Sequence, residues 1–169
     1  MMIQVAGIVN DSIVDGPGLR MCIFTQGCDK SCEGCHNPEA QLLTGGDAYS
    51  VDDLFEKIRK NPLLSGVTLS GGEPLIQAKE LIPLAELINA TDLDIALYTG
   101  DIFEEIIEKN DENVLKLLSF CDTLIDGPFI LAEKSLTINF RGSRNQRILD
   151  CKASLNARKA IPSQDPGWD

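Results

Sequence analysis

The sequence has few aromatic residues, a single histidine and a shortage of basic residues. Aromatic side chains make up 5% of the 169 residues, and 15 Lys and Arg stand against 26 Asp and Glu, a formal net charge of -11. A field of that sign repels a phosphate backbone, which argues against nucleic acid as a partner. No apolar run approaches the roughly 20 residues that a membrane-spanning helix needs. The first residues lack the basic and apolar regions of a secretion signal, so we expect a cytoplasmic protein.

The length and composition indicate one globular domain. At roughly 150 residues per domain, 169 residues correspond to a single unit. Apolar residues make up 43% and charged residues 24%, values typical of folded soluble chains, which excludes disorder and low complexity. Neither an internal repeat nor a linker divides the chain. We therefore expect one domain over residues 1–169, with a frayed tail at 161–169.

The six cysteines are unevenly placed. Three of them fall within the eight positions 28–35, and in a reducing cytoplasm such crowding requires a metal or redox explanation. The other three are Cys22, Cys121 and Cys151, which lie in apolar surroundings. A free cysteine there behaves as a small buried hydrophobic residue, so we expect a structural role for all three.

Hydrophobic patterns along the chain alternate between short strands and helices. We expect strands at 3–9, 19–25, 66–70, 93–98 and 123–126, and helices at 51–60, 81–88, 103–109 and 114–120. Such alternation implies right-handed βαβ units on a parallel sheet. A closed eight-fold barrel takes about 250 residues. The sequence therefore predicts an α/β fold with a mostly parallel sheet, either an open partial (βα) barrel or a doubly wound sheet.

Four segments that follow predicted strands carry the notable residues. The first is 26–46, which lacks periodicity and reads as a long irregular loop of the kind that is usually functional. The others are 71–74, 98–100 and 126–128. Because the loops after parallel strands meet at the carboxyl edge of the sheet, we expect these segments to converge there.

The cysteine cluster suggests a metal with one open coordination position. Cys28, Cys32 and Cys35 supply three thiolates on one loop, enough to hold three corners of a small iron-sulfur cube. A structural zinc ion takes four protein ligands, whereas a catalytic metal keeps one position for substrate. One alternative is a zinc-binding interaction module that borrows His36 or Cys22 as its fourth ligand. Another is simple electron transfer, which usually requires a fully ligated cluster.

A second element is the sequence Gly71-Gly72-Glu73-Pro74 at a strand end. Glycines allow a backbone to approach a ligand closely and expose successive peptide groups, and Glu73 would accept hydrogen bonds from a cationic amine. A double glycine by itself is most often a plain turn. Its position about 40 residues after the cysteine cluster makes it a much stronger signal.

The C-x3-C-x2-C spacing with a downstream Gly-Gly-Glu segment resembles the radical S-adenosylmethionine superfamily. The resemblance implies a shortened form of that family's core fold, with a 4Fe-4S cluster on Cys28, Cys32 and Cys35 through which these cysteines act in catalysis. S-adenosylmethionine would chelate the unligated iron through its amine and carboxylate. One electron from the reduced cluster would break the sulfonium bond and give methionine and a 5'-deoxyadenosyl radical.

The same resemblance assigns the cofactor contacts. It implies that the adenine side is lined by Gly34, Cys35 and His36, and the methionine side by Gly71, Gly72 and Glu73. Position 34 is commonly aromatic across the superfamily, so with glycine here the adenine contact must come from the backbone. Thr99 either touches the ribose or serves as a helix cap.

Further stretches narrow the resemblance to one group of activating enzymes. Residues 15–20, 24–28 and 35–38 are similar to the activases of glycyl radical enzymes, including that of pyruvate formate-lyase. Residues 98–100, 126–129 and 141–148 are similar to the branch that acts on anaerobic ribonucleoside-triphosphate reductase. The implied partner is the large glycyl radical subunit, and the implied reductant is a protein such as a flavodoxin. An activase of another glycyl radical enzyme is the competing hypothesis.

Several other polar residues have two interpretations each. Asp15 and Arg20 either face the incoming glycine loop or belong to an ordinary turn. Asp126 either helps to coordinate a cation near the cofactor or is a turn aspartate. A basic segment near the end either docks an acidic partner, holds a carboxylate or is a solvated stripe; its members are Arg141, Arg144 and Arg147.

Overall fold

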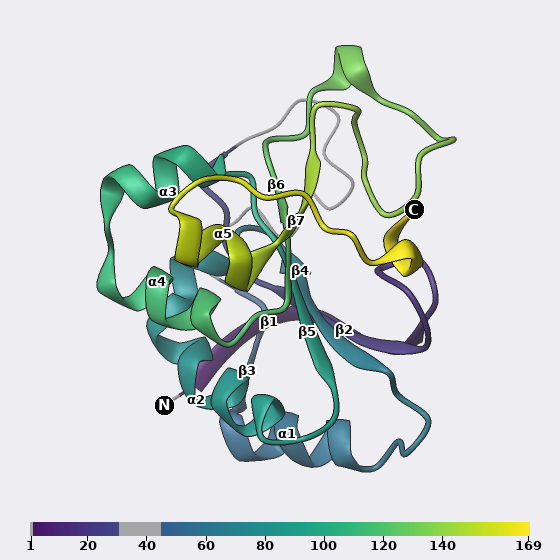
Figure 1. Ribbon diagram of the computed structural model, residues 1–169. Helices are drawn as coiled ribbons and strands as arrows, with labels where there is room; N and C mark the ends of the chain where they lie inside the picture. The colour runs from purple at the N-terminus through teal and green to yellow at the C-terminus, as the bar shows by residue number, and fades with distance from the viewer. Residues whose placement is uncertain (1, 31–44) are drawn as a thin grey trace.

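The described part of the chain forms one seven-stranded sheet (Figure 1). The structure, a computed structural model, describes residues 2–30 and 45–169. The sheet has the strand order β3-β1-β2-β4-β5-β6-β7. Its strands are β1 (Met2–Ser12), β2 (Arg20–Thr25), β3 (Asp47–Ser50), β4 (Gly66–Gly71), β5 (Asp94–Tyr98), β6 (Thr123–Asp126) and β7 (Arg147–Asp150).

The centre of the sheet is parallel and its margins are antiparallel. Strands β2, β4, β5 and β6 pair in parallel, whereas β1 is antiparallel to both β2 and β3, and β7 is antiparallel to β6. Five strands therefore run in one direction. Among the described residues the edge strands β3 and β7 do not pair with each other, so the sheet stays open. The predicted α/β fold with an open, mostly parallel sheet is confirmed.

The helices follow the strands and cover one face of the sheet (Figure 1). They are α1 (Val51–Arg59), α2 (Ala78–Asn89), α3 (Phe103–Lys109), α4 (Glu112–Ser119) and α5 (Cys151–Ala157), with short 3-10 turns η2 (Pro74–Gln77), η3 (Leu131–Glu133) and η4 (Pro166–Trp168). The start of α1 is the predicted one, since the Ser50 hydroxyl accepts a hydrogen bond from the Asp53 amide at 3.0 Å. None of the helices among the described residues is long and apolar enough to span a membrane.

Alternation along β5 separates the two faces of the sheet. Ile95 and Leu97 belong to the large apolar core beneath the helices. Ala96 and Tyr98 lie on the opposite face, in a smaller cluster with Trp168. Burying an Ile or Leu side chain contributes about 1.5–3 kcal/mol, so the helix-covered face holds most of the stabilising contacts. The opposite face is not covered by these helices and is available for a functional site.

The end of the chain differs from the expected frayed tail. Pro162 forms an isolated bridge with Leu149, and the Ser163 amide donates to the Ile148 carbonyl at 3.0 Å. Trp168 is only 4% exposed. A single large side chain, that of Trp168, anchors this segment. One anchor leaves no hydrophobic period in the sequence, so the polar, proline-rich segment was expected to be frayed.

Candidate active site

A cavity of about 840 Å³ opens at the carboxyl ends of the parallel strands. Its lining includes Phe24 in β2 and Cys28 after it, Gly71 in β4 with Gly72 and Glu73 after it, Tyr98 in β5 with Thr99 and Gly100 after it, and Gly127 and Phe129 after β6. The structure thus brings the expected strand-end segments together, as parallel topology requires. The volume lies within the range of small-molecule and cofactor sites.

Cys28 is the described member of the cysteine cluster. It is partly exposed and lines the cavity, and its sulfur accepts a hydrogen bond from the Lys30 amide at 3.4 Å. The predicted partners in this loop are Cys32, Gly34, Cys35 and His36, and they lie outside the described residues. Within residues 2–30 and 45–169, no group of three or more His, Cys, Asp or Glu side chains could hold a metal ion.

The remaining cysteines are structural, as the sequence suggests. Cys22, Cys121 and Cys151 are each 0% exposed. Burial raises the pKa of the Cys151 thiol to about 12 and also raises the pKa values of Cys22 and Cys121. Because a metal ligand must be a thiolate, these three thiols are poor candidates, and the zinc alternative that uses Cys22 loses support.

Gly71 occupies a position that only glycine fits. Its φ of +116° lies in the left-handed region, and a Cβ atom there would stand 2.2 Å from the Thr25 amide nitrogen. The Gly72 amide donates to the Thr25 carbonyl at 3.0 Å, and the Glu73 amide donates to the Gly27 carbonyl at 2.7 Å. The Gly-Gly-Glu segment is therefore held directly against the residue that precedes Cys28.

The Glu73 carboxylate is buried and fully engaged, with 2% of the residue exposed. Its Oε1 accepts from the Gly100 amide at 2.7 Å, its Oε2 accepts from the Leu75 amide at 3.2 Å, and the Thr99 hydroxyl lies 2.9 Å and 3.0 Å from the two oxygens. Burial raises the pKa of this carboxyl to about 7, although these donors oppose the rise. Glu73 thus ties the end of β4 to the end of β5. Its contact with a cofactor amine stays a prediction.

Thr99 and Lys30 complete this side of the cavity. The Thr99 hydroxyl also accepts from the Asp101 amide at 3.0 Å, so it stabilises the turn between β5 and α3, whereas the cap residue of α3 is Ile102. The Lys30 ammonium lies 2.6 Å from a carboxylate oxygen of Asp101. The ribose contact of Thr99 stays a prediction.

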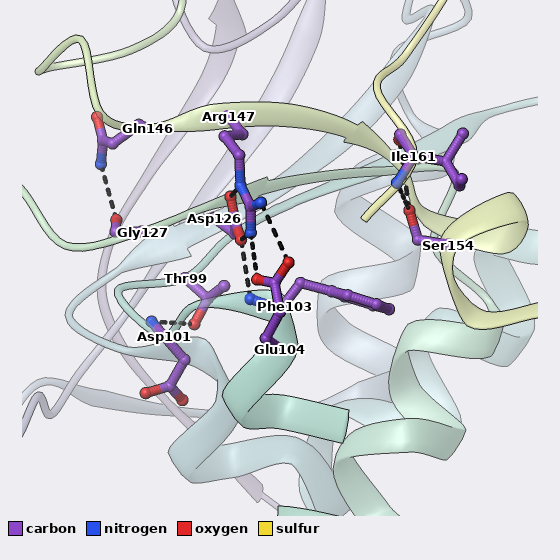
Figure 2. A network of polar contacts seen from close by, with 10 residues as sticks. All are labelled: Thr99, Asp101, Phe103, Glu104, Asp126, Gly127, Gln146, Arg147, Ser154 and Ile161. Carbon is purple, nitrogen blue, oxygen red and sulfur yellow. Dashed lines mark hydrogen bonds and ion pairs between the residues drawn. The ribbon is translucent and has the colours of Figure 1, made fainter. Parts of the chain in front are cut away.

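Asp126 pairs with Arg147 in the network of Figure 2. Arg147 Nε donates to Oδ1 at 3.0 Å and Nη2 donates to Oδ2 at 2.5 Å, while the Phe103 amide donates to Oδ2 at 2.8 Å. Arg147 also contacts Glu104 Oε1 at 2.7 Å. Both oxygens of Asp126 are therefore used within the fold. The interpretation of Arg147 as part of a solvated basic stripe is wrong.

Arg20 lies inside the molecule and does not face the cavity. It is 0% exposed, and its guanidinium donates to the Thr68 hydroxyl at 2.8 Å and contacts Asp94 at 2.5 Å. Its suggested role in meeting an incoming glycine loop is wrong, because it has no access to the site. Asp15 does line the cavity, where its side chain accepts from the Ser12 hydroxyl, and Arg141 lines it as well.

The residues present fit a 4Fe-4S cluster and S-adenosylmethionine. A partly exposed thiol at Cys28 stands at the cavity beside the glycine cradle, where a Cβ on Gly71 would meet the main chain. This glycine lets the main chain at the end of β4 pack closely against β2, which brings the Gly-Gly-Glu segment next to Cys28. The cluster would be held by Cys28 together with Cys32 and Cys35, and the methionine end would lie along Gly71, Gly72 and Glu73.

Comparison with known proteins identifies the family. The model of the family described as "4Fe-4S single cluster domain" matches residues 14–149. The anaerobic ribonucleoside-triphosphate reductase-activating protein of Haemophilus influenzae is 32% identical over 80% of this chain and 90% of its own. The protein of the same name from Enterobacteria phage T4 is 35% identical, with 80% of this chain and 86% of its own covered.

Two further matches cover less of either chain. The pyruvate formate-lyase-activating enzyme of Clostridium pasteurianum is 36% identical over 66% of this chain, which spans half the length of that relative. Among solved structures, QueE from Escherichia coli has a TM-score of 0.45 at 21% identity and covers 59% of this chain and 53% of its own. That structural likeness is too slight to support an argument about the site. On these sequence matches, the chain belongs to the 4Fe-4S single cluster family of radical S-adenosylmethionine enzymes that activate glycyl radical enzymes, whose cofactors are the cluster and S-adenosylmethionine.

Proposed function

We propose that this protein activates anaerobic ribonucleoside-triphosphate reductase by installing a glycyl radical on its large subunit. The observation that carries the proposal is the extent of the matches. The reductase-activating relatives match along 86–90% of their own length. The formate-lyase-activating relative matches along 50% of its length. The reductase-activating relatives are thus matched along most of their length, and the formate-lyase-activating relative along half of it.

The chain's own residues would bind and orient the cofactors. When bound, the cluster and S-adenosylmethionine supply the one-electron chemistry that removes a hydrogen atom from glycine. Cys28, Cys32 and Cys35 would hold the cluster, and the backbone of Gly71 and Gly72 would lie along the methionine part. Glu73 fixes the β4 and β5 ends relative to each other, so it sets the spacing of these two walls.

The remaining cavity wall is suited to excluding water. It includes a set of apolar and aromatic side chains, namely Phe24, Tyr98, Phe129, Ile138 and Phe140. Exclusion of water protects a reactive intermediate from side reactions. The adenine side stays assigned to Gly34, Cys35 and His36. A flavodoxin-type reductant, a cytoplasmic location and the absence of a nucleic-acid partner also belong to the proposal.

Radical transfer to a defined partner tests the function. Anaerobically reconstituted protein, dithionite and S-adenosylmethionine are mixed with the purified reductase subunit or with pyruvate formate-lyase, and the glycyl radical doublet is recorded by electron paramagnetic resonance. We expect the doublet on the reductase. A doublet on formate-lyase alone would overturn the choice of partner.

Metal analysis of the same preparation tests the non-enzymatic alternative. We expect a brown protein with iron and sulfide in near-equal amounts, bleached by dithionite. A colourless protein that carries one zinc ion would favour an interaction module. Intact S-adenosylmethionine after reduction would favour simple electron transfer.

A further inference from the structure

The cavity has an end to which no cofactor contact is assigned. The predicted contacts that belong to the described residues, namely Cys28, Gly71, Gly72, Glu73 and Thr99, lie at or after the carboxyl ends of β2, β4 and β5. The opposite wall consists of two loops, defined here as the first loop (13–18) and the second loop (134–142). They contribute Val14, Asp15, Ser135, Leu136, Ile138 and Phe140 to the lining.

Trp168 lies between these two loops on the face of the sheet opposite the helices. In Figure 1 the yellow η4 turn at the C-terminus lies beside the purple connection between β1 and β2. The Trp168 ring packs edge-on against Phe140 of the second loop, with ring centroids 5.2 Å apart and an interplanar angle of 74°. A centroid separation of this size with near-perpendicular rings is a favourable aromatic arrangement. One side chain of η4 thus contacts the second loop directly.

The first loop also packs against Trp168, through Gly16. Gly16 has a φ of +141°, and a Cβ there would stand 2.7 Å from Arg20 Cδ and 3.0 Å from Trp168 Cη2. Arg20 itself lies with its guanidinium carbon 5.9 Å from the centre of the Trp168 ring, at cation-π range. Gly16 is therefore enclosed between Arg20 and Trp168, and the first loop fits against η4 only because this residue lacks a side chain.

Phe140 adopts a backbone conformation that needs support. Its φ of +62° lies in the left-handed region, which is rare and strained for a bulky residue. The Tyr98 hydroxyl donates to the Phe140 carbonyl at 2.7 Å, and the side-chain amide Nδ2 of the neighbouring Asn139 donates to the Asp169 main-chain oxygen at 2.7 Å. The end of the chain and β5 therefore hold the second loop in place together.

We propose that η4 is a brace between the first and second loops, and that Trp168 is a positioning residue that shapes the end of the cavity where the partner's glycine-bearing segment enters. The inference rests on the proposed function, since a partner's glycine must reach the cavity. Three strongly exposed apolar side chains lie on the braced loops, Ile13 and Val14 at 72% each and Leu136 at 89%. They offer contact area to a polypeptide. The brace lies beyond residue 149, where the match to the family model ends.

Hydrogen exchange on cluster-free protein tests the brace without any activity measurement. In Trp168→Ala we expect amide exchange in residues 13–18 and 135–141 to rise about tenfold or more, as lost packing of an aromatic pair implies. Exchange in α1 should stay unchanged. Trp168→Phe keeps an aromatic ring and should restore most of the protection. Unchanged exchange in both loops of Trp168→Ala would overturn the brace, and so would an equal rise in α1.

A split between partner and cofactor binding tests the positioning role. For Trp168→Ala we expect the KM for the reductase subunit to rise about tenfold, while the Kd for S-adenosylmethionine stays within about twofold of the parent. Equal loss of both, or no change in KM, would overturn the role. If the parent forms no glycyl radical on the reductase, the proposed function fails, whereas the exchange experiment still decides on the brace.

Discussion

The carboxylate of Glu73 accepts a hydrogen bond from the backbone amide of Gly100 at 2.7 Å, which joins the ends of two neighbouring parallel strands. The same carboxylate is reached by the Thr99 hydroxyl and the Leu75 amide. Parallel strands place their loops at one edge but do not fix the separation of those loops. In this protein the buried Glu73 side chain sets the separation of the β4 and β5 loops at the wall of the candidate site.

Glu73 predicts a particular dependence of stability on pH. Burial raises the pKa of its carboxyl from 4.5 to about 7, so between these pH values the native state keeps a proton that the unfolded chain loses. Its contribution to the free energy of unfolding is complete below pH 4.5 and is lost as the pH rises through 7. A shift of this size corresponds to a contribution on the order of 3 kcal/mol.

Glu73→Gln removes that dependence because an amide does not titrate. At pH 5 we expect the variant to be the less stable protein, since its amide group would face backbone donors. By pH 8 the difference should shrink by on the order of 3 kcal/mol. Urea unfolding of cluster-free protein at both pH values measures it, with the exposed Glu86→Gln as the control for removal of a charge. A difference that is the same at pH 5 and pH 8 would show that Glu73 is already ionised in the native state.

Gly71→Ala should destabilise the protein at the end of β4, beside the candidate site. The new Cβ would stand 2.2 Å from a backbone nitrogen, in a left-handed conformation, so we expect a loss of about 3 kcal/mol or more in the free energy of unfolding. Gly7→Ala is the matched control, because a Cβ at Gly7 meets nothing within 4 Å. Denaturant titration of the two variants compares them. Similar stability for both would mean that the backbone at Gly71 adjusts without cost.

The sequence predicts elements well where apolar residues recur with the helical period or form a buried apolar run. The expected helix at 103–109 coincides with α3, and the strand at 123–126 coincides with β6. Strands β3 and β7 have four residues each and form through pairing with β1 and β6, so their own patterns contain no signal. The helix α5 follows β7 and was missed with it.

The candidate site was predictable in its segments but not in its contacts. Strand topology alone indicated that residues 71–73 and 98–100 converge. The Asp126 and Arg147 pair depends on the antiparallel register of β6 and β7, which places the two residues opposite each other. A sequence pattern cannot reveal that register when β7 itself is not recognised. For the same reason, the sequence placed Arg147 in a basic segment with Arg141 and Arg144 and gave no sign of its partner Asp126.

Iron content should separate the cavity cysteine from the buried ones. Cys28→Ala removes a predicted ligand at the cavity wall, and Cys32→Ala removes another, so we expect both variants to lose the cluster after anaerobic reconstitution. Cys22→Ala should keep full iron content, because Cys22 is 0% exposed and its thiol pKa is raised by burial. It should cost about 1–2 kcal/mol of stability through the small cavity it leaves. Full iron content in Cys28→Ala would contradict the ligand assignment.

Removal of Arg147 should destabilise the protein through the charge it leaves behind. Asp126 is 1% exposed, and without Arg147 its carboxylate keeps only the Phe103 amide among the donors found in the described residues. We expect Arg147→Gln to lower the free energy of unfolding by about 2 kcal/mol, a figure that allows for the partial exposure of the guanidinium. Because the cost arises from an unpaired buried charge, adding Asp126→Asn should recover part of it.

The control for this prediction is Arg144→Ala, at an exposed position of the same segment, which should change stability by less than about 0.5 kcal/mol. A double-mutant cycle by urea unfolding gives the coupling energy of the pair, and a coupling near zero would mean that the ion pair of Figure 2 does not stabilise the turn that leads into α3.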